Sequence, residues 1–235
     1  MSKRAVILAG GLGSRLRPYT VVLPKPLMPI GEYPILEVIV RQLIRHGFTH
    51  ITMAVNHQAD IIKAFFGDGS KWGVKIDYSL ENKPLSTMGP LRLIPDLPDN
   101  FLIMNGDVLT DLDYAELFDY HVKSGEIFTI SAHERDHRID YGVLETNQEN
   151  HLTGFIEKPT KRFLVSMGVY IANRAILDFI PEDQAYGFDT LMYDLLRRNR
   201  KVNVKKYGGY WLDIGRPDDY VQAIDEFDSL KDRFL

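Results

Sequence analysis

A glycine-rich stretch near the start of the chain constrains the fold most strongly. The short apolar run over residues 5–8 leads into it and predicts a buried strand. Gly10, Gly11 and Gly13 follow, and because glycine lacks a Cβ, the backbone can turn sharply there and approach a ligand closely. Exposed N–H groups in such a loop make a concavity for anions, and Arg15 then brings a side chain suited to phosphate oxygens. We therefore expect a loop that wraps the phosphates of a nucleotide at the end of the first strand.

Two familiar phosphate-binding motifs do not fit this stretch. A P-loop ends in Gly-Lys-Ser/Thr, which is absent here. The dinucleotide fingerprint G-x-G-x-x-G matches at Gly11 and Gly13, but Leu16 stands where the third glycine belongs. The nearest acidic residue downstream, Glu32, lies in a proline-rich loop rather than at the end of a second strand. A nicotinamide-dependent enzyme is disfavoured, while a glycine-rich turn without a ligand stays open.

Composition narrows the class of protein. The 235 residues have 45% hydrophobic content, which can fill a substantial core. The net charge of −4 disfavours general binding to nucleic acid or to an anionic membrane. The chain has no cysteine, so disulfides and thiolate zinc sites are excluded and a cytoplasmic location is expected. We expect no signal peptide and no membrane span.

Strand and helix patterns alternate along the first part of the chain. Strands are expected at residues 50–55, 74–80, 101–104 and 127–133, and helices at 34–46, 58–66, 87–94 and 114–123. Residues 20–34 contain four prolines and are expected to form a stiff extended loop. This alternation predicts an α/β fold: a three-layer α/β/α sandwich with a mostly parallel, mixed central sheet.

The pattern changes after about residue 135. Residues 141–146 and 151–157 predict a hairpin, and residue 165 begins another strand that ends at 172. Helices at 175–180 and 189–198, strands at 202–206 and 210–214, and a last helix from Pro217 complete the expected elements. We find no repeat or flexible linker, and expect a single domain over residues 1–235.

Three side chains are candidates for phosphate and metal chemistry. Lys25 lies between two prolines, which suits a point charge aimed at a phosphate, although a solvated loop lysine stays open. Asp107 follows a central strand at the sheet edge where α/β proteins bind ligands, and it suits Mg²⁺. Asp213 stands in the apolar run W-L-D-I-G, where a buried carboxylate needs a metal ion or a hydrogen-bonded turn. Glu157 and Lys158 add an acid and a cation, or an ordinary surface pair.

Five motifs occur along the chain in this order: L-A-G-G-L-G-S-R-L, P-K-P-L, N-G-D, E-K-P and W-L-D-I-G. With these motifs the chain resembles the sugar-1-phosphate nucleotidyltransferase family. The segment E-N-K-P-L-S-T-M-G at residues 81–89 is similar to the mannose-1-phosphate guanylyltransferase and N-acetylmuramate-1-phosphate uridylyltransferase branches. The resemblance implies a Rossmann-like sandwich without a C-terminal left-handed β-helix. It also implies a nucleotide-binding part over about residues 1–135 and a sugar-binding part over about 136–235.

The resemblance further implies roles for individual residues. Lys25 and Arg15 would be catalytic, and Asp107 and Asp213 would hold catalytic Mg²⁺. Gly142, Glu157, Lys158 and Ser166 would bind the sugar and its phosphate. The nucleoside triphosphate would be bound by Leu8, Ala9, Gly10, Gly11, Gly13, Ser14, Arg15, Glu81, Pro84, Leu85, Ser86, Thr87, Asn105 and Gly106. Ser86 replaces a usual glycine, Met88 replaces a small residue, and Ser166 stands where many relatives have asparagine.

The expected reaction is attack of a sugar 1-phosphate on a nucleoside triphosphate, which gives an NDP-sugar and pyrophosphate. The sequence favours GTP and a mannose- or heptose-like sugar, while UTP or another triphosphate stays open. One alternative is a metal-dependent glycosyltransferase, because Asp111-Leu112-Asp113 matches a literal Asp-x-Asp motif. A non-catalytic nucleotide-sugar sensor is a second alternative. The sequence is compatible with a homo-oligomer but does not predict one.

Overall fold

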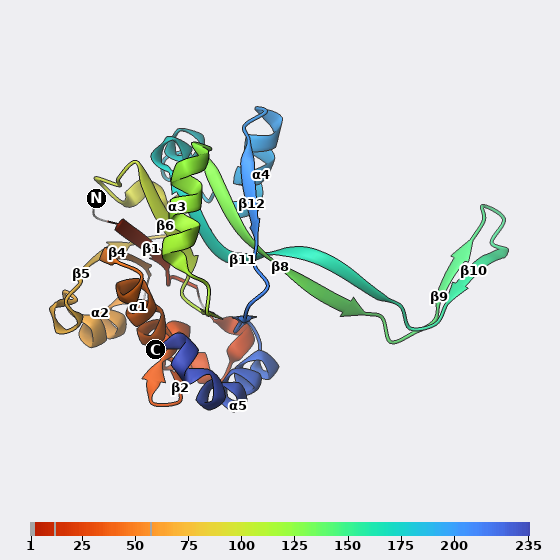
Figure 1. Cartoon of the computed structure of the whole chain (residues 1–235), viewed down its shortest axis with the longest axis horizontal. Helices are drawn as coiled ribbons and strands as arrows, with labels where there is room; N and C mark the ends of the chain where they lie inside the picture. The colour runs from red at the N-terminus through yellow and green to blue at the C-terminus, as the bar shows by residue number, and fades with distance from the viewer. Residues whose placement is uncertain (1–2, 12, 57) are drawn as a thin grey trace.

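The computed structural model describes residues 3–11, 13–56 and 58–235. A seven-stranded sheet with the order β12-β8-β11-β6-β1-β4-β5 runs through the body of the molecule (Figure 1). β11 is antiparallel to both of its neighbours, whereas the other neighbouring pairs are parallel. The strands are β1 (Lys3–Leu8), β4 (Phe48–Val55), β5 (Lys75–Leu80), β6 (Asn100–Asn105), β8 (Phe128–Arg138), β11 (Thr160–Asn173) and β12 (Val202–Lys206).

Helices cover both faces of this sheet. Because side chains alternate along a strand, each buried strand contributes to a core on either face. In β1, Ala5 and Ile7 enter one core, and Val6 between them enters a second core on the opposite face. The first core takes side chains from α1 (Ile35–Arg45), α2 (Ala59–Phe66), α3 (Tyr114–Ser124) and α5 (Pro217–Phe234). The second takes them from the 3-10 helices η5 (Gly89–Leu93) and η6 (Arg174–Phe179) and from α4 (Phe188–Arg197). The predicted three-layer α/β/α sandwich with a mostly parallel, mixed sheet is confirmed.

The proline-rich segment differs from its prediction. Residues 20–34 do not form a continuous extended loop: they hold the short 3-10 helix η3 (Lys25–Leu27) and two short paired strands, β2 (Pro29–Ile30) and β3 (Tyr33–Pro34). Pro26 lies at the start of η3, where its fixed φ suits a helical turn and its missing N–H costs no bond. Residues 87–94 and 175–180 likewise form 3-10 helices rather than α-helices.

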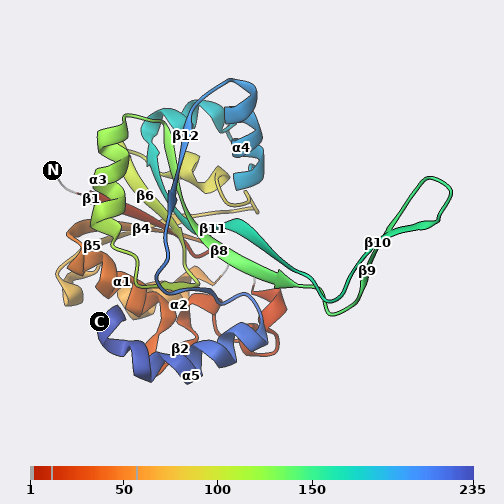
Figure 2. The same ribbon diagram turned by 45° about the vertical axis from the view of Figure 1, so that its right-hand side comes forward.

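The predicted hairpin is present but does not fold onto the body. β8 and β11 run beyond the sheet as a two-stranded ribbon, which carries β9 (Val143–Thr146) and β10 (Leu152–Ile156) at its far end (Figures 1 and 2). We call residues 134–164 the arm. In both views the arm projects well away from the rest of the molecule. Among the described residues, no helix has the length and apolar character needed to cross a membrane.

Candidate active site

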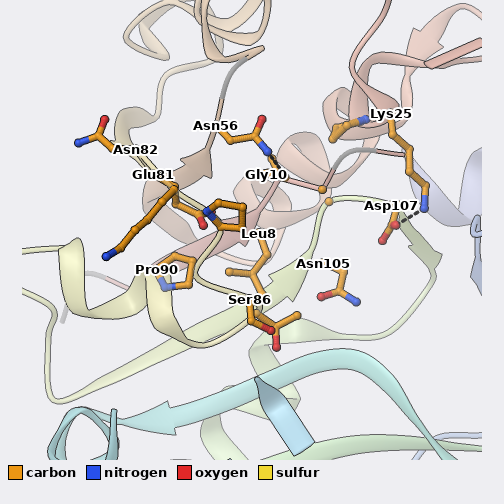
Figure 3. Close-up of a pocket in the computed structure, with 17 residues that line it drawn as sticks. Leu8, Gly10, Lys25, Asn56, Glu81, Asn82, Ser86, Pro90, Asn105 and Asp107 are labelled. Atoms are coloured by element: carbon orange, nitrogen blue, oxygen red, sulfur yellow. Dashed lines mark hydrogen bonds and ion pairs between the residues drawn. The ribbon is translucent and has the colours of Figure 1, made fainter. Parts of the chain in front are cut away.

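A pocket opens where the strand order of the sheet reverses. β1 lies between β4 on one side and β6 on the other, and ligands bind outside the carboxyl ends of the strands at such a point. The cavity there measures about 510 Å³ (Figure 3). It is lined by Leu8, Ala9, Gly10, Gly11, Lys25, Pro26, Asn56, Glu81, Asn82, Lys83, Pro84, Ser86, Thr87, Pro90, Asn105, Gly106 and Asp107.

Glu81 forms one end of this pocket. Figure 3 shows Glu81 and Asn82 on the side away from Asp107. The backbone N–H of Leu85 donates to Glu81 Oε2 at 3.1 Å, while Oε1 faces Gly10 so closely that a Cβ added to Gly10 would lie 2.8 Å from it. Burial raises the pKa of Glu81, because few water molecules solvate its charge. This end of the pocket offers a carboxylate in a poorly solvated place.

Lys25 and Asp107 form the other end. The Lys25 ammonium donates to Asp107 Oδ2, and this contact is drawn in Figure 3. Lys25 is buried although it is charged, as the two prolines beside it hold its backbone in η3. Asp107 Oδ1 is buried and has no hydrogen-bond partner among the described residues. A buried oxygen left unpaired beside a paired one is costly unless a ligand supplies the missing contact.

Asp213 lies close to this pair but is not among the residues that line the pocket. It belongs to β13 (Trp211–Asp213), which pairs antiparallel with β7 (Val108–Thr110), so that Asp213 is opposite Val108. The backbone N–H of Ile214 also donates to the Asp107 carbonyl at 3.1 Å. Burial raises the pKa of Asp213, the Asp107 charge raises it further, and Lys25 and Arg15 act in the opposite direction. Two carboxylates and two cations therefore share one electrostatic cluster.

The predicted loop residues 13–15 lie beside the pocket rather than in its wall. Gly13 has a φ of +59°, which favours glycine, and the Thr20 hydroxyl donates to its carbonyl at 2.7 Å. Ser14 and Arg15 begin the short helix η1 (Ser14–Leu16), and both are exposed. Arg15 approaches Gly215, next to Asp213. Leu12, part of the glycine-rich motif, lies outside the described residues.

Two further predicted residues have informative positions. Ser86 lines the pocket with a φ of 64°, which explains why a glycine is usual at this position. Ser166 lies at the base of the arm, where its hydroxyl is 3.0 Å from that of Tyr170. Gly168 packs directly against Asn105 of the pocket wall. Ser166, two residues from Gly168, is thus near the pocket but does not line it. Leu85 is buried and is not a lining residue either.

The structure does not bring Gly142, Glu157 and Lys158 to the pocket of the same chain. All three lie on the arm, where Gly142 packs so tightly against the Phe155 ring that a Cβ would approach it to 2.6 Å. Glu157 lies beside Gly142 as well. Their role in sugar binding stays a prediction.

Several lining residues were not among the predicted ones. Asn56 directly follows β4, and its side chain donates to the Gly10 carbonyl (Figure 3). A polar residue that ends the strand next to the first strand is a signal that could have identified it. Asn82 and Lys83 lie inside a segment that the sequence did single out. Pro26 belongs to the P-K-P-L motif, whereas Pro90 carries no chemical signal, so only the fold reveals Pro90.

Comparison with known proteins gives a consistent result. The family model described as nucleotidyl transferase matches residues 4–229. The chain belongs to the nucleotidyl transferase family. It is 34% identical over 239 residues to a probable mannose-1-phosphate guanylyltransferase 1 of Oryza sativa subsp. japonica, which covers 97% of this chain and 66% of that protein. It is 34% identical over 241 residues to a UTP–glucose-1-phosphate uridylyltransferase of Synechocystis sp., with 94% and 62% covered.

The chain also resembles solved structures along nearly its whole length. The crystal structure of HddC from Yersinia pseudotuberculosis complexed with GMP-PN has a TM-score of 0.72 and 27% identity, and the match covers 96% of this chain and 99% of that one. The chain spans less than two thirds of the two curated relatives, at 66% and 62% of their lengths. The recognised motifs are therefore those of a nucleotidyl transferase domain.

Proposed function

We propose that the pocket catalyses nucleotidyl transfer from a nucleoside triphosphate to a sugar 1-phosphate, which releases pyrophosphate. The observation that carries the proposal is the division of one cavity into two unlike ends. Glu81 offers a hydrogen-bonding carboxylate at one end, and the Lys25–Asp107 pair offers cation and metal-ligand chemistry at the other. A nucleotide has the same division, with a neutral base at one end and an anionic phosphate chain at the other. The relatives' names agree with this reaction class.

The proposed reaction needs little general acid–base catalysis from the protein. The attacking group is a phosphate oxygen that is already anionic near neutral pH, so no Ser, Cys or His nucleophile is required. Positioning of the two phosphates in line and neutralisation of developing charge supply most of the catalysis. Lys25 and Arg15 are the residues that would stabilise charge on the α-phosphate and on the leaving pyrophosphate.

The residues at the phosphate end fit a bound Mg²⁺. Asp107 Oδ1 is a buried oxygen that has no partner within residues 3–11, 13–56 and 58–235, and Asp213 is a second carboxylate whose pKa is raised in part by Asp107. In the described part of the chain no cluster of three or more His, Cys, Asp or Glu side chains stands ready for a metal. That suits Mg²⁺, which often takes one or two carboxylates and completes its shell with water and phosphate oxygens. When bound, Mg²⁺ would offset the negative charge of the reacting phosphates.

Guanine is the base that suits the Glu81 end best. Its Watson–Crick edge presents two donors side by side, N1–H and the N2 amino group, and a carboxylate accepts both. Uracil presents a single N3–H between two carbonyl acceptors, which a carboxylate repels. The HddC structure that resembles this chain was determined with GMP-PN. We propose GTP as the triphosphate and a mannose- or heptose-like sugar 1-phosphate as the acceptor.

The glycosyltransferase alternative loses its main support. The Asp111 carboxylate accepts hydrogen bonds from Tyr207, from the Tyr210 N–H and from Arg233. Asp113 caps α3, because its carboxylate accepts from the Glu116 N–H at 2.8 Å. Both carboxylates of the Asp-x-Asp motif therefore serve local structure outside the pocket wall.

The test is pyrophosphate release in the presence of Mg²⁺ with GTP, UTP, dTTP, CTP and ATP, each paired with a panel of sugar 1-phosphates. We expect release that requires one triphosphate and one sugar 1-phosphate together, with GTP giving the highest kcat/KM. Tight nucleotide binding without release across the panel would instead support the sensor. Hydrolysis of an NDP-sugar that needs no pyrophosphate would support the glycosyltransferase.

A further inference from the structure

The arm is a part of the molecule that lacks packing of its own. Five consecutive residue pairs, from Thr160 opposite Arg138 to Leu164 opposite Glu134, join its two strands. From Thr160 to Leu164 every residue is exposed, and so is nearly every residue of β9 and β10. A two-stranded ribbon with no sheet or helix against it is marginally stable in water. The arm therefore needs another surface to bury one of its faces.

The arm also carries apolar side chains that nothing in the described part of the chain covers. Leu144 and Phe155 stand opposite each other across β9 and β10, and they are 62% and 58% exposed. Tyr141 beside them is 79% exposed. Apolar side chains gathered on one exposed ribbon are typical of an interaction surface.

Some charged side chains of the arm form ion pairs with described residues, and others do not. Arg162 of the stem pairs with Asp136 at 2.7 Å. Glu157 and Lys158 form no ion pair with any described residue, and Lys158 has a φ of 45°, a conformation that is strained for a residue with a side chain. Such strain is commonly found where a side chain clamps a ligand. An unpaired acid and an unpaired cation are thus displayed where the same chain offers no ligand pocket.

The pocket, in contrast to the arm, has no unpaired cation in its described wall. Its substrates, under the proposed function, include a sugar 1-phosphate with two negative charges and several hydroxyl groups. Of the cations in the described pocket wall, Lys25 is engaged by Asp107 and Lys83 pairs with Asp183 at 2.7 Å. No arm residue lines the cavity. The described pocket wall therefore lacks a cation that could be assigned to the sugar phosphate alone.

We propose that the arm of one chain closes over the pocket of a second copy, and that Glu157 and Lys158 bind the sugar 1-phosphate there in trans. This inference rests on the proposed function for its ligand. The ladder between β8 and β11 directs the arm away from its own body (Figures 1 and 2), so a return to its own pocket would have to break this ladder. Exchange of identical elements between two copies needs no such break, and it closes a symmetric dimer.

A receiving surface lies beside the phosphate loop. Tyr19, Val21 and Val22 are 57%, 63% and 79% exposed, although they are apolar. Thr20 between them is tied to Gly13 by the hydrogen bond to its carbonyl. An arm that buried Leu144 and Phe155 on this surface would lie next to the phosphate end of the pocket.

The first part of the test needs no turnover. Light scattering after size exclusion should give about twice the chain mass of 27.0 kDa. The double variant Leu144→Ser/Phe155→Ser should shift the protein to the monomer, whereas Glu149→Ala/Lys161→Ala, which changes one acid and one lysine on the same arm, should leave the dimer intact. A monomeric wild type, or a dimer that the first variant leaves unaffected, would overturn the proposal even if the enzyme were active.

The second part asks whose pocket each arm completes. Asp107→Asn protein has an intact arm and an impaired pocket, and Glu157→Ala/Lys158→Ala protein has the reverse. Mixed dimers would contain one complete site, so an exchanged equimolar mixture should recover about a quarter of wild-type activity, while each variant alone stays inactive. Absence of recovery from mixed dimers, with wild type active, would show that the arm serves its own chain. An inactive wild type that is nevertheless an arm-dependent dimer would reject the proposed function and keep the exchange of arms.

Discussion

Asp107 is the side chain on which the proposed chemistry of the pocket depends most. One of its oxygens accepts from Lys25, and the other is buried without a partner in the part of the chain that the structure describes. Its backbone carbonyl accepts from Ile214, which fixes the neighbouring strand that carries Asp213. The carboxylate is therefore well positioned and only half satisfied, as expected for a group that completes its contacts with a ligand.

We predict that Asp107→Asn lowers kcat by at least about a hundred-fold, because the amide removes a charge at the reacting phosphates. Triphosphate binding, measured by calorimetry, should change much less because Glu81 and the glycine loop remain. Asp178→Asn, at an exposed position, is the matched control and should have wild-type kinetics. An active Asp107→Asn enzyme would remove Asp107 from the catalytic cluster.

Asp213 should make stability depend on pH. Its pKa is raised in the folded state, so the folded chain binds the proton more tightly than the unfolded chain does. The resulting penalty is present at neutral pH and disappears as the pH falls through the folded pKa toward the ordinary carboxyl value. Asp213→Asn, measured without metal, should thus have a higher Tm than wild type at pH 8, and the difference should vanish near pH 4. A lower Tm for the variant at pH 8 would mean that Lys25 and Arg15 outweigh burial.

Glu81 should determine the choice of base. We predict that Glu81→Gln lowers kcat/KM for GTP by roughly ten- to a hundred-fold, since one bidentate contact discriminates by about 1–3 kcal/mol. The effect on UTP should be small or favourable, because the amide can donate to a uracil carbonyl. Competition assays with both triphosphates in one reaction would measure the ratio directly. An equal loss for GTP and UTP would place Glu81 outside base recognition.

The position of the glycine-rich loop agrees with its prediction. Three glycines after an apolar run predict a loop at the end of β1, and the pocket opens at this loop. The contact between Gly10 and Glu81 could not be predicted, because it joins two elements that are remote in sequence. Asn56 was missed for the same reason: its importance arises from the pairing of β4 with β1.

We predict that Gly10→Ala raises KM for the triphosphate roughly ten-fold while Tm changes little. The added Cβ would lie 2.8 Å from Glu81 Oε1, and the end of that side chain can move aside at small cost to folding but not to base binding. Gly208→Ala, where a Cβ meets nothing within 4 Å, is the control. A large loss of Tm in Gly10→Ala would show that the contact is structural.

At the scale of the whole molecule, the sequence predicts the layers well and the arm poorly. Alternating apolar patterns are local, so they indicate the strands and helices of the body, and the order of the motifs indicates the family. The hairpin at residues 141–157 was predicted as a hairpin, and β9 and β10 agree with it. Its projection from the body depends on the point before which β11 pairs with β8 alone: Thr160–Ser166 pair only with β8, and pairing with β6 begins at Val169. No local sequence pattern indicates that point.

Nucleotidyl transfer at this pocket predicts the fate of each phosphate of the triphosphate, and a tracer experiment can follow two of them. Wild-type protein would be incubated with Mg²⁺ and a sugar 1-phosphate that supports pyrophosphate release. Parallel reactions would contain GTP labelled with ³²P at either the α- or the γ-phosphate. We predict that the α-label appears in the NDP-sugar and the γ-label in pyrophosphate, both only when the sugar 1-phosphate is present. Label released as orthophosphate or GMP, or turnover that ignores the sugar 1-phosphate, would contradict nucleotidyl transfer at this pocket.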